Sequence, residues 1–243
     1  MRAILTFHGV DSSGSVLSVS GSQLASLVGA IRASGHEIVP LCDLLDGAST
    51  TRDAVALTFD DGVVSVAEAG APMLEDLGAP ATLFLTTGRV GLDNGWPSQP
   101  PAVRRLPMMT WRQIEGLHAK GWAIEAHSVT HPDLRTLSAD ALDDELGRPV
   151  DDIRRRIGVA PTVLAYPYGA HDRRVEEHAG RHYRHAVTTA FRPLRREEAP
   201  HRVPRLDACY LRTPTVHRWF GGGVAFRVYL AARGFLRTLE RRT

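Results

Sequence analysis

Short apolar segments rich in β-branched residues alternate along this sequence with longer segments of helical periodicity, and this alternation constrains the fold more than any other feature. Strands are expected at Ala3–Phe7, His36–Leu41, Val55–Phe59, Ala81–Thr86, Trp122–Ala126, Thr162–Tyr166, Ala186–Thr189 and Arg202–Leu206. Helices are expected at Ser22–Ser34, Val63–Leu77, Thr110–Lys120, Ala139–Ile157 and Asp172–His182. Such alternation is typical of βα units around a parallel sheet. Since no glycine-rich phosphate turn follows any strand, we predict a single-domain α/β fold, a closed or nearly closed barrel.

Composition excludes several classes of function. A chain of 243 residues with 43% hydrophobic and 23% charged residues is globular, and a net charge of +2 is too small for a nucleic-acid-binding surface. Cys42 and Cys209 lie far apart and outside any CxxC pattern, so the sequence indicates neither a disulfide framework nor a cysteine zinc site. No apolar segment has the length of a signal sequence or a spanning helix, so we expect a cytoplasmic protein. The sequence does not indicate an oligomeric state.

Polar clusters follow several of the expected strands. They are His8, Asp60–Asp61, His127 and Tyr168. In a parallel barrel, reactive residues come from the carboxyl ends of several strands, so these clusters are expected to meet on one face. The long segment Gly88–Met109, rich in proline and glycine, is expected to form a wall or lid.

Asp60 and Asp61 are adjacent carboxylates at the end of the apolar strand Val55–Phe59. Their mutual repulsion would be relieved by a bound cation. Side-chain alternation along an extended chain would then let one carboxylate face the metal while its neighbour faces a water molecule. The alternative is an ordinary strand-end turn.

His127 and His131 lie four residues apart in HSVTHP, after the expected strand Trp122–Ala126. A single helical turn would place both rings on one face. Two imidazoles and one carboxylate leave coordination positions open for water and substrate, as a catalytic metal site requires. The alternative is that both histidines are structural.

The motifs TFDDG at Thr58–Gly62 and HSVTHP at His127–Pro132 resemble the first two motifs of the polysaccharide deacetylases, carbohydrate esterase family 4 with NodB homology. YPYG at Tyr166–Gly169 resembles the third motif. LTFHGV at Leu5–Val10 and RVPR at Arg202–Arg205 are similar to the bacterial exopolysaccharide and lipid-linked-glycan branch.

This resemblance implies a distorted (β/α)7-type barrel that acts on an N-acetylated carbohydrate. It implies one divalent metal, with zinc expected and cobalt, manganese, nickel and iron as alternatives. It assigns the metal to Asp61, His127 and His131, the general base to Asp60, and oxyanion stabilisation to the backbone N–H of Tyr168.

Two departures from the family pattern concern catalytic groups. Ala165 stands where family members often carry an arginine that orients the catalytic aspartate, and Arg205 is a candidate replacement. No leucine-x-histidine motif for the catalytic acid is evident late in the chain, and His8 matches the position that supplies the acid in the exopolysaccharide branch. The alternatives are an ordinary surface ion pair for Arg205 and a buried structural histidine for His8.

We therefore expect a metal-dependent hydrolase that removes N-acetyl groups, in which the metal activates water, Asp60 acts as base and His8 as acid. The alternatives are an O-acetyl esterase, a hydrolase of small cyclic amides on the same metal site, and a carbohydrate-binding homologue without activity. Because an ester needs less protonation of its leaving group, removing His8 should affect an ester less than an amide.

The C-terminal segment is expected to follow a catalytic barrel of residues 1–220 as a basic amphipathic helix within residues 221–243. On a helical wheel of Val224–Arg242 one side holds Val224, Val228, Ala231, Ala232, Phe235, Leu236 and Leu239. The other side holds Arg227, Arg233, Arg237, Glu240 and Arg241, with Phe226 and Leu230 among them. Either this helix rests peripherally on the inner face of the membrane, with Gly221–Gly223 as a hinge, or it packs against the barrel.

Overall fold

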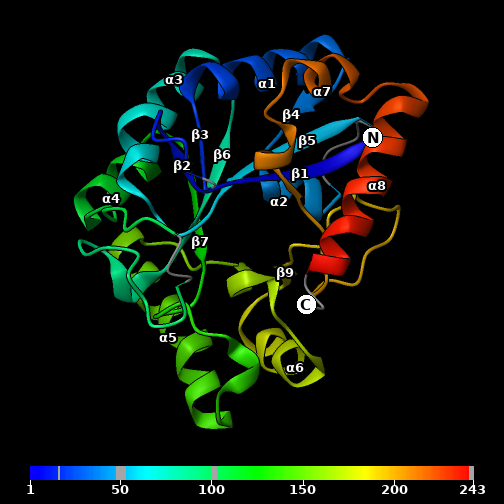
Figure 1. The fold of residues 1–243 in the computed structure, drawn as a ribbon. Coiled ribbons are helices and arrows are strands. Elements are labelled where there is room, and N and C mark those ends of the chain that lie inside the picture. The colour runs from blue at the N-terminus through cyan, green and yellow to red at the C-terminus, as the bar shows by residue number, and fades with distance from the viewer. Residues whose placement is uncertain (16, 48–52, 100–102, 241–243) are drawn as a thin grey trace.

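The computed structural model describes residues 1–15, 17–47, 53–99 and 103–240, and these form a curled parallel sheet surrounded by helices (Figure 1). The strands around the barrel are β1 (Arg2–Phe7), β5 (Ala54–Phe59), β6 (Ala81–Leu85), β7 (Ala123–Ala126), β8 (Val163–Ala165), β9 (His185–Val187) and β10 (Leu206–Asp207). Their order is β10-β1-β5-β6-β7-β8-β9, and neighbouring strands are parallel. A parallel bridge between Val187 and Val203 joins β9 to the segment before β10 and nearly closes the ring. The predicted distorted barrel is confirmed.

The distortion of the barrel is visible at β5. Strand β4 (Glu37–Ile38) pairs with Ala54 and Val55 at the start of β5, whereas β6 pairs with Leu57–Phe59 at its end. Two neighbours thus share one edge of β5. A separate two-stranded sheet, β2 (Gly9–Val10) with β3 (Ser18–Val19), follows β1.

Helices cover the outside of the sheet (Figure 1). They are α1 (Gly21–Ala33), α2 (Leu41–Leu45), α3 (Ala71–Asp76), α4 (Trp111–Ala119), α5 (Ala139–Ile157), α6 (Arg173–His182), α7 (Pro214–Trp219) and α8 (Gly223–Glu240). Shorter turns are π-helical at Val66–Gly70 and 3₁₀ at Thr87–Arg89, Leu134–Thr136, Pro167–Gly169 and Ala208–Leu211. A capping box of Thr110 with Gln113 opens α4.

Three expected elements differ from the prediction. The strand expected at His36–Leu41 is only Glu37–Ile38, because the chain turns at Pro40 into α2. The helix expected at Val63–Leu77 is a π-helical turn followed by α3. The last strand begins at Leu206 and not at Arg202, because Pro204 has no N–H to donate to a ladder.

Alternation along the strands separates two parts of the core and positions the site. Ile4 and Ala56 belong to a cluster inside the barrel, and Leu41 and Leu44 of α2 close the end at which the strands begin. We call this the lower end of the barrel, and the end at which the strands finish the upper end. The neighbours of Ile4 and Ala56 along β1 and β5 point outward into the main cluster against the helices. Because side chains alternate, Thr6 and His8 follow Ile4 on the inward face, and Thr58 and Asp60 follow Ala56. The apolar lower half of the barrel therefore leads into a polar upper end.

Helix α8 packs along one side of the barrel (Figure 1), where Arg237 pairs with Asp207 of β10. Phe226 and Leu230 are buried in the main core cluster, and the Phe226 ring lies 5.2 Å from that of Phe220. The helix and the barrel therefore share one core. Arg241 and Arg242, which the sequence places at the end of this helix, lie outside the described residues. Within the described part of the chain, no helix combines the length and apolar character needed to cross a membrane.

Candidate functional site

Three side chains at the upper end of the barrel have the arrangement of metal ligands. Asp61 Oδ1 lies 3.3 Å from His127 Nε2 and 3.6 Å from His131 Nε2. Ligands bound at about 2.0–2.1 Å to one tetrahedral ion lie roughly 3.3 Å apart. All three residues are buried, and among the described residues theirs is the one group of histidine, cysteine and acidic side chains with such spacing. The three residues expected to bind metal are therefore brought together.

The hydrogen bonds of His127 and Asp61 also suit a cation. His127 Nδ1 lies 2.7 Å from the carbonyl oxygen of Ala165, to which it can only donate, and this directs the Nε2 lone pair toward Asp61. Asp61 Oδ1 is buried and has no hydrogen-bond partner among the described residues. A carboxylate oxygen facing ring nitrogens in a buried site is stabilised by a positive ion between them.

Burial affects the protonation of these groups. Burial and the neighbouring His127 lower the pKa of His131 to about 3, so that its ring is neutral. Burial raises the pKa of Asp61, but the contact with His127 outweighs it and holds this pKa far below its ordinary value. A neutral imidazole and an ionised carboxylate are the forms that bind a metal.

The backbone turns sharply at each motif. Among the described residues, the non-glycine residues with positive φ are Asp61 (74°), Ser128 (64°), His131 (61°) and Tyr168 (59°). Left-handed backbone at non-glycine residues is strained and is concentrated at functional sites. Two predicted reasons for the site geometry are therefore wrong. Asp60 and Asp61 diverge because of a left-handed turn and not by alternation along an extended chain, and the two histidines lie on a loop and not on a helical turn.

Glu145 on α5 holds the histidine loop in place. Its carboxylate accepts hydrogen bonds from the backbone N–H groups of Val129 (2.8 Å) and Thr130 (2.9 Å) and from the Thr130 hydroxyl (2.6 Å). Sequence reasoning missed this residue, since an acidic residue on an amphipathic helix gives no signal of being buried. The loop between His127 and His131 thus owes its shape to a helix that follows it.

Asp60 forms a buried, bidentate ion pair with Arg205. Arg205 Nη1 and Nη2 each lie 2.7 Å from a carboxylate oxygen of Asp60. Asp60 is 3% exposed and Arg205 is 1% exposed, so this is not the surface ion pair considered as an alternative. Arg205 also donates to Thr58 Oγ1 and to the carbonyl oxygen of Thr188, both at 3.2 Å. Burial raises the pKa of Asp60, but Arg205 outweighs it and keeps this pKa below its ordinary value.

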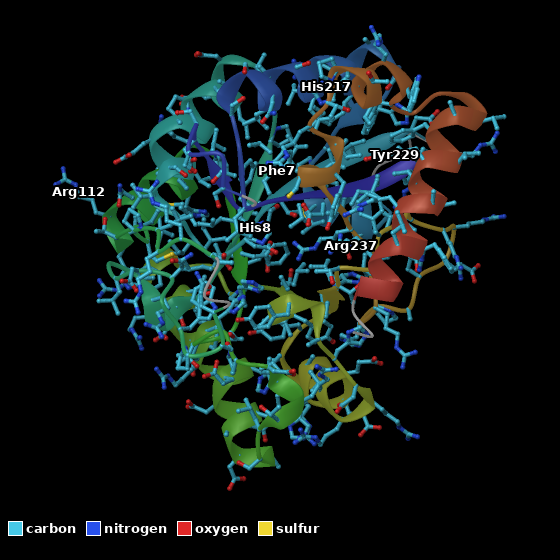
Figure 2. The ribbon with its side chains drawn as sticks, in the orientation of Figure 1. Phe7, His8, Arg112, His217, Tyr229 and Arg237 are labelled. Carbon is cyan, nitrogen blue, oxygen red and sulfur yellow. The ribbon has the colours of Figure 1, made fainter. Side chains whose placement is uncertain are left out.

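His8 lies directly after β1, at the end of the barrel where the strands end (Figure 2). Strands β1 and β5 run in register, with Phe7 opposite Phe59, and the backbone N–H of Asp60 donates to the carbonyl oxygen of Phe7. His8 is half-buried and lines the same cavity as Asp60. It is therefore not a fully buried histidine.

A cavity of about 190 Å³ unites the predicted site residues except Arg205, which lies behind Asp60. It is lined by His8, Leu17, Asp60, Asp61, Trp96, Gln99, Val103, His127, His131, Tyr166, Tyr168 and Thr189. Five of these lining residues had not been identified individually as site residues: Leu17, Trp96, Gln99, Val103 and Thr189.

The segment expected to be a wall or lid forms one side of this cavity. The Trp96 ring stacks on His131 with centroids 4.1 Å apart. Ser98 Oγ lies 2.9 Å from the Tyr168 hydroxyl and donates to the carbonyl oxygen of His131 at 3.2 Å. A tryptophan within a loop rich in proline and glycine is the sequence signal that could have identified this contact.

Comparison with known proteins gives a consistent family match. A family model described as polysaccharide deacetylase matches residues 47–187. The chitin deacetylase of Colletotrichum lindemuthianum is 31% identical over 120 residues, which cover 47% of this chain and 41% of that protein. The poly-beta-1,6-N-acetyl-D-glucosamine N-deacetylase of Staphylococcus aureus (strain MSSA476) is 25% identical over 167 residues, covering 63% of this chain and 54% of that protein. The chain thus spans about half the length of these relatives.

Solved structures with low sequence identity share the fold. IcaB from Ammonifex degensii superposes with a TM-score of 0.73 at 23% identity, covering 88% of this chain and 93% of that one. The Streptococcus pyogenes deacetylase PplD, solved in complex with acetate, gives a TM-score of 0.72 at 20% identity, covering 85% of this chain and 91% of that one.

Proposed function

Because the chain belongs to the polysaccharide deacetylase family, we propose that it removes N-acetyl groups from a carbohydrate by metal-assisted hydrolysis. The observation that carries this proposal is the buried group of Asp61, His127 and His131 beside Asp60 in one cavity. The group has the donor set of a catalytic zinc site, two histidines and one carboxylate with positions left for water and substrate. A bound divalent ion would lower the pKa of a coordinated water and polarise the acetyl carbonyl.

Asp60 is the proposed general base. Arg205 keeps the Asp60 carboxylate ionised inside the protein, so that Asp60 can accept a proton from the attacking water at neutral pH. The bidentate contact also orients the carboxylate. Arg205 is therefore proposed as a positioning residue, in place of the arginine that family members often carry at position 165.

His8 is the proposed general acid. An amide nitrogen leaves only after it gains a proton, and an imidazole is the side chain best suited to donate one near neutral pH. His8 and Asp60 follow neighbouring strands and line the same cavity, so acid and base face the same substrate.

Tyr168 is proposed to stabilise the oxyanion through its backbone N–H. Its left-handed conformation (φ 59°, ψ 3°) turns the peptide group sharply between Pro167 and Gly169, at the edge of the cavity. An N–H group held rigidly beside the reacting carbonyl stabilises negative charge that develops in the transition state.

The proposed substrate is an oligomer or polymer of N-acetylglucosamine. The relatives named for their substrates act on chitin and on poly-beta-1,6-N-acetyl-D-glucosamine. The cavity of about 190 Å³ is too small to enclose a polymer, so one N-acetylated sugar would enter it while the rest of the chain stays outside.

The proposal is tested with the full chain, stripped of metal and reloaded with zinc. Calorimetry should give one ion bound per chain, and His131→Ala should weaken binding, whereas Glu115→Ala on the exposed surface should not. The zinc-loaded protein should release acetate from β-1,4- and β-1,6-linked N-acetylglucosamine oligomers, and a chelator should stop the release. Zinc binding that does not depend on His131 would overturn the metal assignment. Acetate release from O-acetylated sugars alone would favour an esterase.

A further inference from the structure

Helix α8 presents an apolar stripe to the outside. Val224, Val228, Phe235 and Leu236 are exposed by 69%, 59%, 66% and 47% of their surface. Spacings of four, seven and one residues place them on one side of a helix. With Trp219 at the end of α7, they make up five of the eight large hydrophobic side chains that are exposed in the described residues. We call these five residues the α8 stripe. Apolar exposure is thus concentrated in 18 residues of the chain and is not scattered over the surface.

The opposite face of α8 turns Arg233 and Arg237 toward the barrel, and Arg237 is labelled in Figure 2. The guanidinium carbon of Arg233 lies 3.8 Å from the centre of the Tyr210 ring, and that of Arg237 lies 5.1 Å from it. Arg237 also forms an ion pair with Asp207 at 3.7 Å. Phe226 and Leu230, 1% and 3% exposed, anchor this face in the core. Stacked arginines and two apolar side chains therefore hold the helix against the barrel. The face that carries the α8 stripe is exposed to solvent.

The segment that carries the stripe contains arginines but no acidic residue, although Asp207 and Glu240 directly flank it. From Ala208 to Leu239 the sequence contains five arginines and no acidic residue. Arg227, between Val224 and Val228 along α8, and Arg218, next to Trp219, are exposed. A second copy of this chain packed stripe to stripe would bring these arginines near their counterparts without an acidic partner. An anionic surface would instead attract them.

We propose that the α8 stripe is a docking surface for the anionic headgroup and acyl boundary of a lipid membrane. An exposed apolar helical face with exposed arginines in the same segment, preceded by an exposed tryptophan at the end of α7, has the chemistry of a helix that lies in the membrane interface. The helix need not leave the barrel to bind, since the stripe already faces outward. Docking of this kind is independent of the metal site.

The test is flotation of the full-length protein with vesicles of equimolar phosphatidylglycerol and phosphatidylcholine at low salt. The protein should float with these vesicles, and pure phosphatidylcholine vesicles should bind it less. The double variant Val228→Glu/Phe235→Glu should lower the membrane partition coefficient at least about tenfold, because it removes two inserted side chains and adds two negative charges. Arg227→Ala should lower it about fivefold.

A matched control comes from another part of the surface. Val159, after α5, is 59% exposed, as Val228 is, and lies outside the stripe. Val159→Glu should bind vesicles as the wild type does. Circular dichroism checks that each variant is folded. In the wild type, brominated lipid should quench the fluorescence of Trp219 if the stripe inserts, and this quenching should be absent in Trp219→Phe.

Three outcomes would overturn the proposal. One is a wild-type protein that stays with the unbound fraction on anionic vesicles at low salt. Another is equal loss of binding in Val159→Glu and the stripe variant. The last is a wild-type dimer, detected by light scattering, that the stripe variant converts to a monomer, which would assign the surface to a second copy of the chain.

Discussion

Replacing Arg205 by methionine tests how a buried charge governs both stability and catalysis. The change removes the bidentate partner of Asp60 and retains most of the side-chain volume, including the packing against Phe84, whose ring lies 5.3 Å from the guanidinium carbon. Leaving one charge of a buried pair uncompensated costs about 3–5 kcal/mol. We therefore expect the free energy of unfolding of Arg205→Met, measured by urea titration at neutral pH, to fall by about this amount.

The chain offers a matched control in Arg192. It also forms a bidentate pair, with Glu198 at 2.6 and 2.8 Å, but its side chain is 34% exposed. Pairs open to solvent contribute about 0–1 kcal/mol because solvent screens them, and this pair is only partly buried, so Arg192→Met should cost less than Arg205→Met. In an Asp60→Asn background, Arg205→Met should also cost less than in the wild type, since no carboxylate remains to be left unpaired.

The same substitution should change the pH dependence. In the wild type the pKa of Asp60 lies below its ordinary value, so its ion pair stabilises the fold above about pH 4 and loses this contribution as the pH falls further. Without Arg205, burial raises the pKa, and Asp60 takes up a proton at a higher pH. The acid limb of kcat/KM should therefore move to higher pH, and kcat should fall at neutral pH. Stability equal to that of Arg192→Met, together with an unchanged acid limb, would refute this reasoning.

Further expectations concern the catalytic groups and the turn that carries Tyr168. Asp60→Asn should still bind zinc in calorimetry but lose ~10²–10⁴-fold in acetate release, and a loss below about tenfold would count against a general base. His8→Ala should slow hydrolysis of an N-acetylated sugar far more than that of an activated acetate ester, and equal losses would remove its assignment as the acid. Gly169→Ala should destabilise the protein by at least ~1–3 kcal/mol, because its Cβ would lie 2.2 Å from Thr189 Oγ1, whereas Gly78→Ala, also at positive φ but in open space, should cost less.

Local signals in the sequence predicted much of the framework of the site. Helix α5 begins and ends at the predicted residues, because Ser138 caps its start and Gly158 adopts the left-handed conformation that ends it. The strands that carry His8, Asp60 and His127 were identified because both faces of such strands are covered, which leaves continuous apolar runs. In a parallel barrel those runs end at the same face, so the polar residues that follow them could be expected to meet.

Contacts between residues far apart in the sequence were decided only by the tertiary structure. The partner of Asp60 lies 145 residues away, and its choice depends on closure of the ring between β9 and β10. Glu145 is buried because the loop before α5 folds back over it, which periodicity does not report. The outward face of α8 was decided in the same way: Phe226 and Leu230 fill a space that the barrel leaves, and their burial determines which side of the helix meets the solvent. A sequence thus specifies where strands end and which residues follow them, but shape complementarity and charge pairing over long distances determine which of those residues touch.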